Sequence, residues 1–290
     1  MIDFTDCERK KKAYGGANGN KLSIDIDGVL YMLKLPNHAI KNQNLSYANS
    51  AVCEYLGCHI YQMLGIDTQD TILGTYNYHG KERIVVACKD FVGINNQLLD
   101  FASIKNQIID SNSNGYGTEL KDILETIEKQ TVIDQKVLKD RFWLMFVVDA
   151  LIGNWDRHNG NWGFLYNAID DSIKLAPIYD CGSCLFPQID EELISKVLSN
   201  KQEMNYRIFD VPTSAILIDG KRANYNKLLS SHEYSELDEA IKIVVSKINM
   251  SSIFDLIESV ECVSNNHKTF LKEIIEQRYS KLILANQKMQ

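Results

Sequence analysis

The pattern of hydrophobic and polar positions in the first ninety residues predicts strands with one helix among them. Residues 21–26 alternate apolar and polar side chains, which is the period of a half-buried strand. Asp27 and Gly28 follow as a hairpin signal, so the chain is expected to return as a second strand. Apolar positions at three- and four-residue intervals then indicate a helix. The predicted elements are strands over 21–26 and 29–35, a helix over 46–65, and strands over 71–76 and 83–88.

The pattern becomes mainly helical after Gly93. Residues 132–152 are apolar on most faces, which predicts a buried central helix that ends at Gly153. The other elements predicted in this part are helices over 119–129, 237–248 and 270–284, and a short hairpin over 162–166 and 173–178. We therefore predict an α+β, two-lobed fold. A small β-rich lobe with one helix spans 1–92, and a larger helical lobe spans 93–290.

Composition limits the classes of protein. The chain has 290 residues, of which 45% are hydrophobic and 24% charged, and this composition excludes a disordered or fibrous protein. The formal net charge of −7 argues against a general nucleic-acid binder. The longest apolar run, residues 142–148, is far shorter than the roughly 20 residues of a membrane span. No signal peptide is recognised, and seven scattered cysteines indicate free thiols. We expect a cytoplasmic enzyme without a membrane span, and export as an effector stays open.

The segment that follows the central helix carries the most specific chemistry. Asp156 precedes Asn161 by five residues, which is the spacing of the protein-kinase catalytic loop. In that loop the Asp accepts the proton of the substrate hydroxyl and the Asn holds a magnesium ion. Asp180, in Asp-Cys-Gly beyond the predicted hairpin, takes the position of the metal-binding Asp. Arg157 and His158 are expected to support the loop through hydrogen bonds rather than to take part in the chemistry.

The predicted small lobe supplies the complementary groups. A glycine-rich segment precedes the first strand, and its backbone N–H groups could approach nucleotide phosphates. Lys34 ends an apolar strand and Glu54 lies on the helix that follows, which is the order of the phosphate-binding Lys and its Glu partner. The nucleotide-binding residues that we predict are Gly16, Ala17, Asn18 and Gly19 of the glycine-rich segment, Lys34, Glu54, and Lys89, Asp90 and Phe91, which take the place of a kinase hinge.

On these motifs the chain resembles the HipA-like branch of the protein-kinase superfamily, and within it the compact CtkA-type bacterial kinases. The segments that carry the resemblance are Glu54 and residues 15–21, 30–34, 73–76, 86–91, 153–164 and 176–185. The resemblance implies a kinase fold that uses ATP and Mg²⁺ to phosphorylate Ser or Thr of a protein, with autophosphorylation. It implies Asp156 as catalytic base, Asn161 and Asp180 as Mg²⁺ ligands and Lys34 as phosphate-binding lysine. An antitoxin or a host protein stays open as a partner.

The sequence leaves alternatives open. Asp-Arg-His-x-x-Asn also resembles the catalytic loop of phosphoinositide kinases, so a small-molecule or lipid phosphotransferase is the alternative enzyme. A catalytically inactive kinase fold that acts as a binding module is the alternative from a different class of protein. The glycine-rich segment lacks the serine that HipA phosphorylates in itself, so the autophosphorylation site is unassigned. Ser23 and Ser183 are candidates for this site by position alone. Cys181 and Cys184 form a single Cys-x-x-Cys, which is too few ligands for a structural zinc site.

Overall fold

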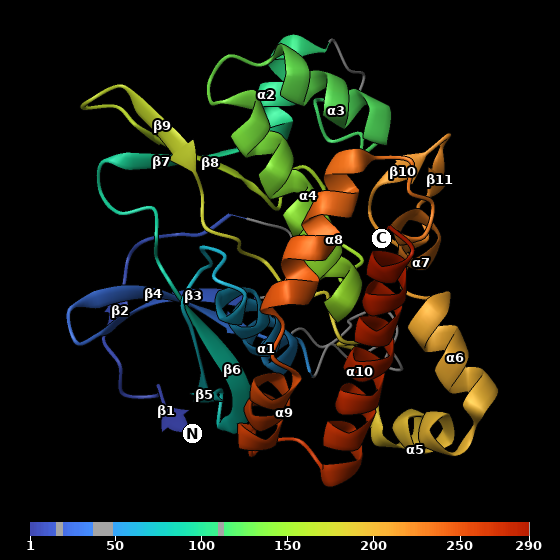
Figure 1. Cartoon of the computed structure of the whole chain (residues 1–290). Coiled ribbons are helices and arrows are strands. Elements are labelled where there is room, and N and C mark those ends of the chain that lie inside the picture. The colour runs from blue at the N-terminus through green and yellow to red at the C-terminus, as the bar shows by residue number, and fades with distance from the viewer. Residues whose placement is uncertain (16–19, 37–48, 110–112, 290) are drawn as a thin grey trace. The chain divides into compact units, whose positions relative to one another are not determined.

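A computed structural model describes residues 1–15, 20–36, 49–109 and 113–289 (Figure 1). The chain divides into two compact units. The first unit comprises 1–91, 178–199 and 250–272, and the second comprises 92–177, 200–249 and 273–290. The first unit thus takes in two later segments that lie outside the predicted lobe 1–92.

The first unit is built on a six-stranded sheet with the strand order β1-β5-β6-β4-β3-β2. Its elements are β1 (Ile2–Asp3), β2 (Arg9–Lys10), β3 (Asn20–Ile26), β4 (Val29–Leu35), α1 (Ser50–Met63), β5 (Thr71–Tyr78), β6 (Lys81–Lys89), α5 (Glu191–Ser199) and α9 (Met250–Ser259). The predicted order of strand, strand, helix, strand, strand is confirmed for 20–89. Helix α1 is described from Ser50, and the predicted start at 46 lies outside the described residues.

A two-residue turn fixes how β3 and β4 pair. Asp27 and Gly28 both have positive φ, at 51° and 80°, which is the conformation of a type I′ hairpin turn. The turn pairs Ile26 with Val29, and the antiparallel register continues to the pair Lys21 and Lys34. Because side chains alternate along a strand, this register decides which side chains share a face.

The two faces of β4 have different neighbours. Leu33 and Leu35 are buried in an apolar cluster with Ile24 and Val85. The intervening residue, Lys34, points to the other face, where Val86 and Cys88 pack with Ala51 of α1. The strand pattern therefore places a single lysine of β4 on the side of the sheet that α1 covers.

The second unit is mainly helical. Its elements are β7 (Asn96–Asp100), α2 (Phe101–Ile108), α3 (Leu120–Lys129), α4 (Gln135–Ile152), β8 (Gly163–Asn167), β9 (Ser172–Leu175), α6 (Lys201–Phe209), β10 (Leu217–Ile218), β11 (Lys221–Arg222), α7 (Tyr225–Leu229) and α8 (Ser235–Lys247). Helix α10 (Asn265–Gln287) begins in the first unit and ends in the second. No helix in the described part of the chain is both long and apolar enough to cross a membrane.

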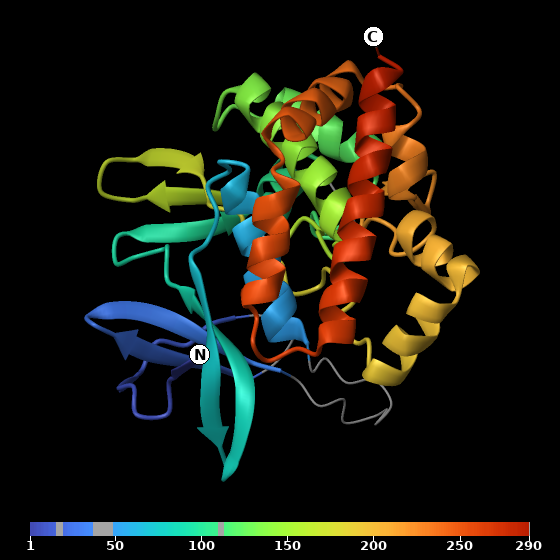
Figure 2. The same cartoon turned by 60° about the horizontal axis from the view of Figure 1, so that its bottom comes forward.

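Helix α4 is the central element of the second unit, and it runs alongside α8 (Figures 1 and 2). It begins at Gln135 rather than at the predicted residue 132, because the Asp134 side chain caps it by accepting a hydrogen bond from the Val137 N–H at 2.9 Å. Gly153 ends it as predicted, in the left-handed conformation with φ 64°. The segment after Gly153 is the predicted catalytic loop, so a rigid, buried helix leads directly into it.

One prediction for this unit was wrong. Residues after Gly93 were expected to be helical, but Asn96–Asp100 form strand β7. This strand pairs with β8, which pairs in turn with β9, so the predicted hairpin has a third strand. Its pairing partner is more than sixty residues away in the sequence, and a local pattern could not show it.

Candidate active site

The candidate residues of the first unit centre on the ammonium group of Lys34. Its Nζ donates a hydrogen bond to Glu54 Oε2 at 2.9 Å, although the two residues lie on β4 and α1. Glu54 is only 2% exposed, and its carboxylate is therefore a buried charge that depends on this lysine for compensation. The structure brings together the two residues whose pairing the sequence predicted.

Asp180 is the second carboxylate at the same lysine. Its Oδ1 accepts a hydrogen bond from Lys34 Nζ at 2.9 Å, and its side chain is 45% exposed. Asp180 has a φ of 58°, in the left-handed region that residues with a side chain seldom adopt. Burial by itself would lower the pKa of Lys34, but the charges of Asp180 and Glu54 outweigh it and raise that pKa well above its ordinary value.

Cys181 and Gly182, the other two residues of the Asp-Cys-Gly motif, both lie next to the Glu54 carboxylate. The backbone N–H of Cys181 donates to Glu54 Oε1 at 3.0 Å. A Cβ on Gly182 would lie 2.8 Å from Glu54 Oε2, so any larger residue would push against the carboxylate. Glycine at this position therefore allows the segment that carries Asp180 to approach α1 closely.

The candidate residues of the second unit lie in a loop that a buried ion pair holds. Arg157 Nε donates to Asp149 Oδ2 at 2.9 Å, and its second terminal nitrogen donates to Asp149 Oδ1 at 3.3 Å. Asp149 is 1% exposed and Arg157 is 3% exposed. Asn154 also donates to Asp149 Oδ1, at 3.0 Å. Arg157 therefore has the supporting position that the sequence predicted, and its partner Asp149 is a residue that sequence reasoning missed.

The backbone around Asp156 is fixed from both sides. The Asp156 N–H donates to Asn154 Oδ1 at 3.2 Å, and the Asp156 carbonyl accepts from Asn161 Nδ2 at 2.9 Å. Arg157 donates to the Asn161 carbonyl at 2.8 Å. These bonds link the two ends of the loop, and the half-buried Asp156 side chain stands on a backbone with little freedom to move.

Asn161 of the second unit and Asp180 of the first unit each offer an oxygen of the kind that an oxygen-preferring cation binds. The Asn161 amide nitrogen donates a hydrogen bond to the Asp156 carbonyl, so the amide oxygen is the atom that can act as a ligand. Asp180 offers a partly exposed carboxylate. Within the described ranges no three His, Cys, Asp or Glu side chains gather into a metal site. Mg²⁺ does not need such a cluster, because it binds to one or two protein oxygens together with phosphates and water.

The predicted hinge, Lys89 to Phe91, uses several of its groups within the chain. The Lys89 N–H and carbonyl bond to Asp70 and Gln69, and the Asp90 N–H bonds to the Leu30 carbonyl. The described residues supply no hydrogen-bond partner for the backbone of Phe91, whose ring lies 5.6 Å from that of Tyr179.

Asp90 itself is anchored through its side chain. It is 3% exposed, accepts a hydrogen bond from Tyr14 Oη at 2.9 Å and forms an ion pair with Lys12. Its carboxylate is thus directed at the segment before the glycine-rich residues rather than outward. Gly16, Ala17, Asn18 and Gly19 lie outside the described residues.

The Cys-x-x-Cys motif is a packing feature in this structure. Cys181 and Cys184 are both fully buried, and Cys184 Sγ lies 3.3 Å from the carbonyl oxygen of Cys53 in α1. A Cβ on Gly57 would lie 2.9 Å from the Cys181 Cβ, so the motif packs tightly against this helix. All seven cysteines are free thiols, as the sequence predicted.

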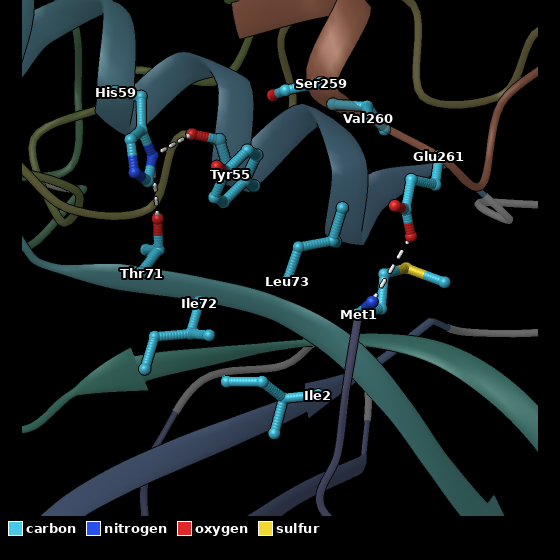
Figure 3. A pocket seen from close by; sticks show the side chains of 10 residues that line it. All are labelled: Met1, Ile2, Tyr55, His59, Thr71, Ile72, Leu73, Ser259, Val260 and Glu261. Carbon is cyan, nitrogen blue, oxygen red and sulfur yellow. Dashed lines mark hydrogen bonds and ion pairs between the residues drawn. The ribbon is translucent and has the colours of Figure 1, made fainter.

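A cavity of about 320 Å³ lies beside α1, apart from the residues described so far. Tyr55 and His59 of α1, strand β5 and the segment Ser259 to Glu261 line it, and Met1 closes one side (Figure 3). None of the predicted catalytic or nucleotide-binding residues within the described ranges lines this cavity.

Comparison with known proteins defines the class to which this fold and these residues belong. The model of the HipA-like C-terminal domain matches residues 13–261, and the chain belongs to that family. Among curated proteins, it is 44% identical over 284 residues to the serine/threonine-protein kinase CtkA of Helicobacter pylori, which covers 97% of this chain and 86% of that protein.

The solved structures agree with this assignment. The crystal structure of a Helicobacter pylori proinflammatory kinase CtkA matches with a TM-score of 0.94 and 43% identity, over 99% of this chain and 97% of that one. A chain from the Shewanella oneidensis complex of HipA, HipB and operator DNA matches with a TM-score of 0.52 and 12% identity, over 94% of this chain and 65% of that one. The second likeness concerns the fold alone.

Three predictions from the sequence are confirmed by these comparisons. They are the HipA-like family, the mixed α+β kinase-like fold with a sheet-rich N-terminal region, and the enzyme class, a protein-kinase phosphotransferase.

Proposed function

We propose that this chain is a serine/threonine kinase that transfers the γ-phosphoryl group of Mg-ATP to a protein hydroxyl and also phosphorylates itself. The observation that carries the proposal is the ammonium group of Lys34, held between the carboxylates of Glu54 and Asp180. Family membership and a relative named as a serine/threonine-protein kinase support the choice of a protein acceptor.

The first unit binds the nucleotide in this proposal. Lys34 contacts the phosphates, and Glu54 keeps it charged and directed. Gly16 to Gly19 cover the phosphates with their backbone N–H groups. Adenine meets the segment Lys89 to Phe91, and the Phe91 backbone is the part of it that has no hydrogen bond to the described residues.

The second unit supplies the group that handles the proton. The Asp156 carboxylate accepts the proton of the substrate hydroxyl as its oxygen bonds to the γ-phosphorus. The bond between that phosphorus and the oxygen of the β-phosphate breaks, and ADP leaves with both electrons of that bond. The fixed backbone around Asp156 supports this role, because a positioned base loses less entropy when the acceptor binds.

Asn161 and Asp180 are the residues that would hold Mg²⁺. Their oxygens suit the ion, as their hydrogen bonds and exposure indicate. When bound there, the ion supplies neutralisation of the negative charge on the β- and γ-phosphate oxygens.

Transfer of radioactive phosphate tests the proposal. The purified wild type, Asp156→Ala and Asp140→Ala are incubated with Mg²⁺, γ-labelled ATP and a basic protein acceptor, and ATP affinity is measured by calorimetry. Asp140→Ala is the matched control, because this partly exposed carboxylate on α4 forms an ion pair with Lys136 and with no other residue that the structure describes. We expect Asp156→Ala to lose at least about 100-fold in transfer while its ATP affinity stays within about twofold.

Each contrary result identifies what is wrong. Normal turnover by Asp156→Ala would exclude this residue as the base. Binding of ATP without labelling of any protein would contradict protein kinase activity and favour a small-molecule or lipid phosphotransferase, or an inactive binding module. A wild type that binds no ATP would refute the proposed function as a whole.

A further inference from the structure

Lys21 lies beside Lys34 on the same face of the sheet. The two residues are direct partners in the antiparallel pair of β3 and β4, and directly opposed residues project to the same side. Their neighbours Leu22 and Leu33, which are also paired, belong to the apolar cluster on the other face. The hairpin therefore brings two lysines to the face on which Glu54 and Asp180 are found.

The two lysines differ in how their charges are compensated. Lys34 forms ion pairs with two carboxylates, whereas Lys21 forms none with any residue in the described ranges. Instead, the Nζ of Lys21 donates to the carbonyl oxygen of Gly15 at 2.6 Å. Lys21 is half-buried, so it is a partly desolvated cation beside another cation, with a neutral oxygen as its hydrogen-bond partner.

The titration behaviour of Lys21 agrees with this geometry. Burial lowers its pKa, and the positive charge of Lys34 lowers it further. Asp180 and Glu54 raise it in part, and the net shift is downward. A cation in this situation gains more from a nearby anion than an exposed surface lysine does, because it has less water to give up.

We propose that Lys21 is a second phosphate-binding lysine, which contacts the phosphate chain of the nucleotide together with Lys34. The inference rests on the proposed function, since it places the nucleotide phosphates near Lys34. An ammonium group has three N–H donors, and Gly15 accepts one of them. A phosphate oxygen accepts another, so that Lys21 links the anion to the residue directly before the glycine-rich segment.

A purely structural role for Lys21 makes a different prediction. If the lysine only holds the Gly15 carbonyl, a side chain that keeps an N–H donor for this carbonyl restores ATP affinity, even without the positive charge. If Lys21 binds phosphate, loss of the charge weakens ATP and ADP whether or not a donor remains, and leaves adenosine unchanged. The two roles are therefore separated by comparing a neutral variant that keeps the donor with one that lacks it.

The test measures the affinity of ATP, ADP and adenosine by calorimetry for the wild type and three variants. Lys21→Met removes both charge and donor, Lys21→Gln removes the charge but keeps an N–H donor for Gly15, and Lys81→Met is the matched control. Lys81 is an exposed lysine at the start of β6, far along the sheet from this pair. We expect both Lys21 variants to lose about tenfold or more in ATP affinity, and adenosine affinity to stay within about twofold.

Several results would overturn the proposal. ATP affinity in the Lys21 variants within twofold of Lys81→Met would refute it. Equal losses for ATP and adenosine, or full recovery of ATP affinity in Lys21→Gln, would assign Lys21 to the structural role. If Lys21→Met does not fold, Lys21→Gln carries the comparison. A wild type that does not bind ATP refutes the proposed function. If the wild type binds ATP and the Lys21 variants bind it as tightly, only this inference is refuted.

Discussion

Replacement of Asp149 tests how the loop of Asp156 is held. Asp149→Ala removes the carboxylate that pairs with Arg157 and accepts from Asn154. Arg157 is 3% exposed and would stay behind as a buried charge without its ion-pair partner. Breaking a buried ion pair from one side costs about 3–5 kcal/mol of unfolding free energy. Since whole domains are stable by about 5–15 kcal/mol, this change should be visible in any unfolding experiment.

The assay can be confined to the second unit. The chain has three tryptophans, and Trp143, Trp155 and Trp162 all lie within residues 92–177 of that unit. Tryptophan fluorescence during urea unfolding therefore reports on the unit that contains Asp149, and the free energy follows from the midpoint and the slope. Asp140→Ala is the control on the same helix, and its exposed pair with Lys136 should contribute less than about 1 kcal/mol.

A double variant checks the reason for the loss. Asp149→Leu with Arg157→Met leaves no charge buried, so its loss should be clearly smaller than the sum of the two single changes. An Asp149→Ala protein within about 0.5 kcal/mol of the control would refute the reasoning. So would a double variant that loses as much as the sum, because the two side chains would then be energetically independent.

Two further predictions concern the first unit. Glu54→Gln keeps the shape of the side chain but removes a charge from Lys34, so kcat/KM for ATP should fall about tenfold or more; an unchanged kcat/KM would contradict the role of this pair. Burial lowers the pKa of His267 in the folded chain. As the pH falls below about 6.5, this histidine is therefore protonated in the unfolded chain before it is protonated in the folded chain, and the free energy of unfolding decreases. Calorimetric melting of His267→Gln between pH 7 and 5 should therefore show a shallower decline than the wild type, and equal slopes would exclude this histidine as a cause.

Local patterns were enough to predict the elements that carry the candidate residues. The alternation in β4 separates Lys34 from Leu33 and Leu35, and the apolar spacing of α1 predicts its helix. The order of motifs then predicted which side chains meet, and Lys34 and Glu54 do lie in contact. Their roles in binding stay predictions, as does the role of Asp156.

Contacts that depend on chain reversal were missed, but one of them left a signal in the sequence. Asp149 pairs with Arg157 because the chain turns back after Gly153, and the apolar pattern of α4 gave no indication of that pair. Lys21 could have been found, because a two-residue turn at Asp27 and Gly28 pairs residue 26 with 29 and thereby 21 with 34. The turn type fixed the register, and the register brought the two lysines together.

The two carboxylates at Lys34 are built differently, and the difference suits them to different parts in the proposed reaction. Glu54 is 2% exposed and its other oxygen accepts the Cys181 N–H, so it cannot leave Lys34 without becoming a buried charge that lacks compensation. The Asp180 side chain is 45% exposed, and its carboxylate can exchange the ammonium group for water or a metal ion at a much smaller cost. We therefore expect an incoming phosphate to replace Asp180 at Lys34 and to leave Glu54 in place. Lys34 then keeps its charge and its direction, while Asp180 becomes available as a metal ligand.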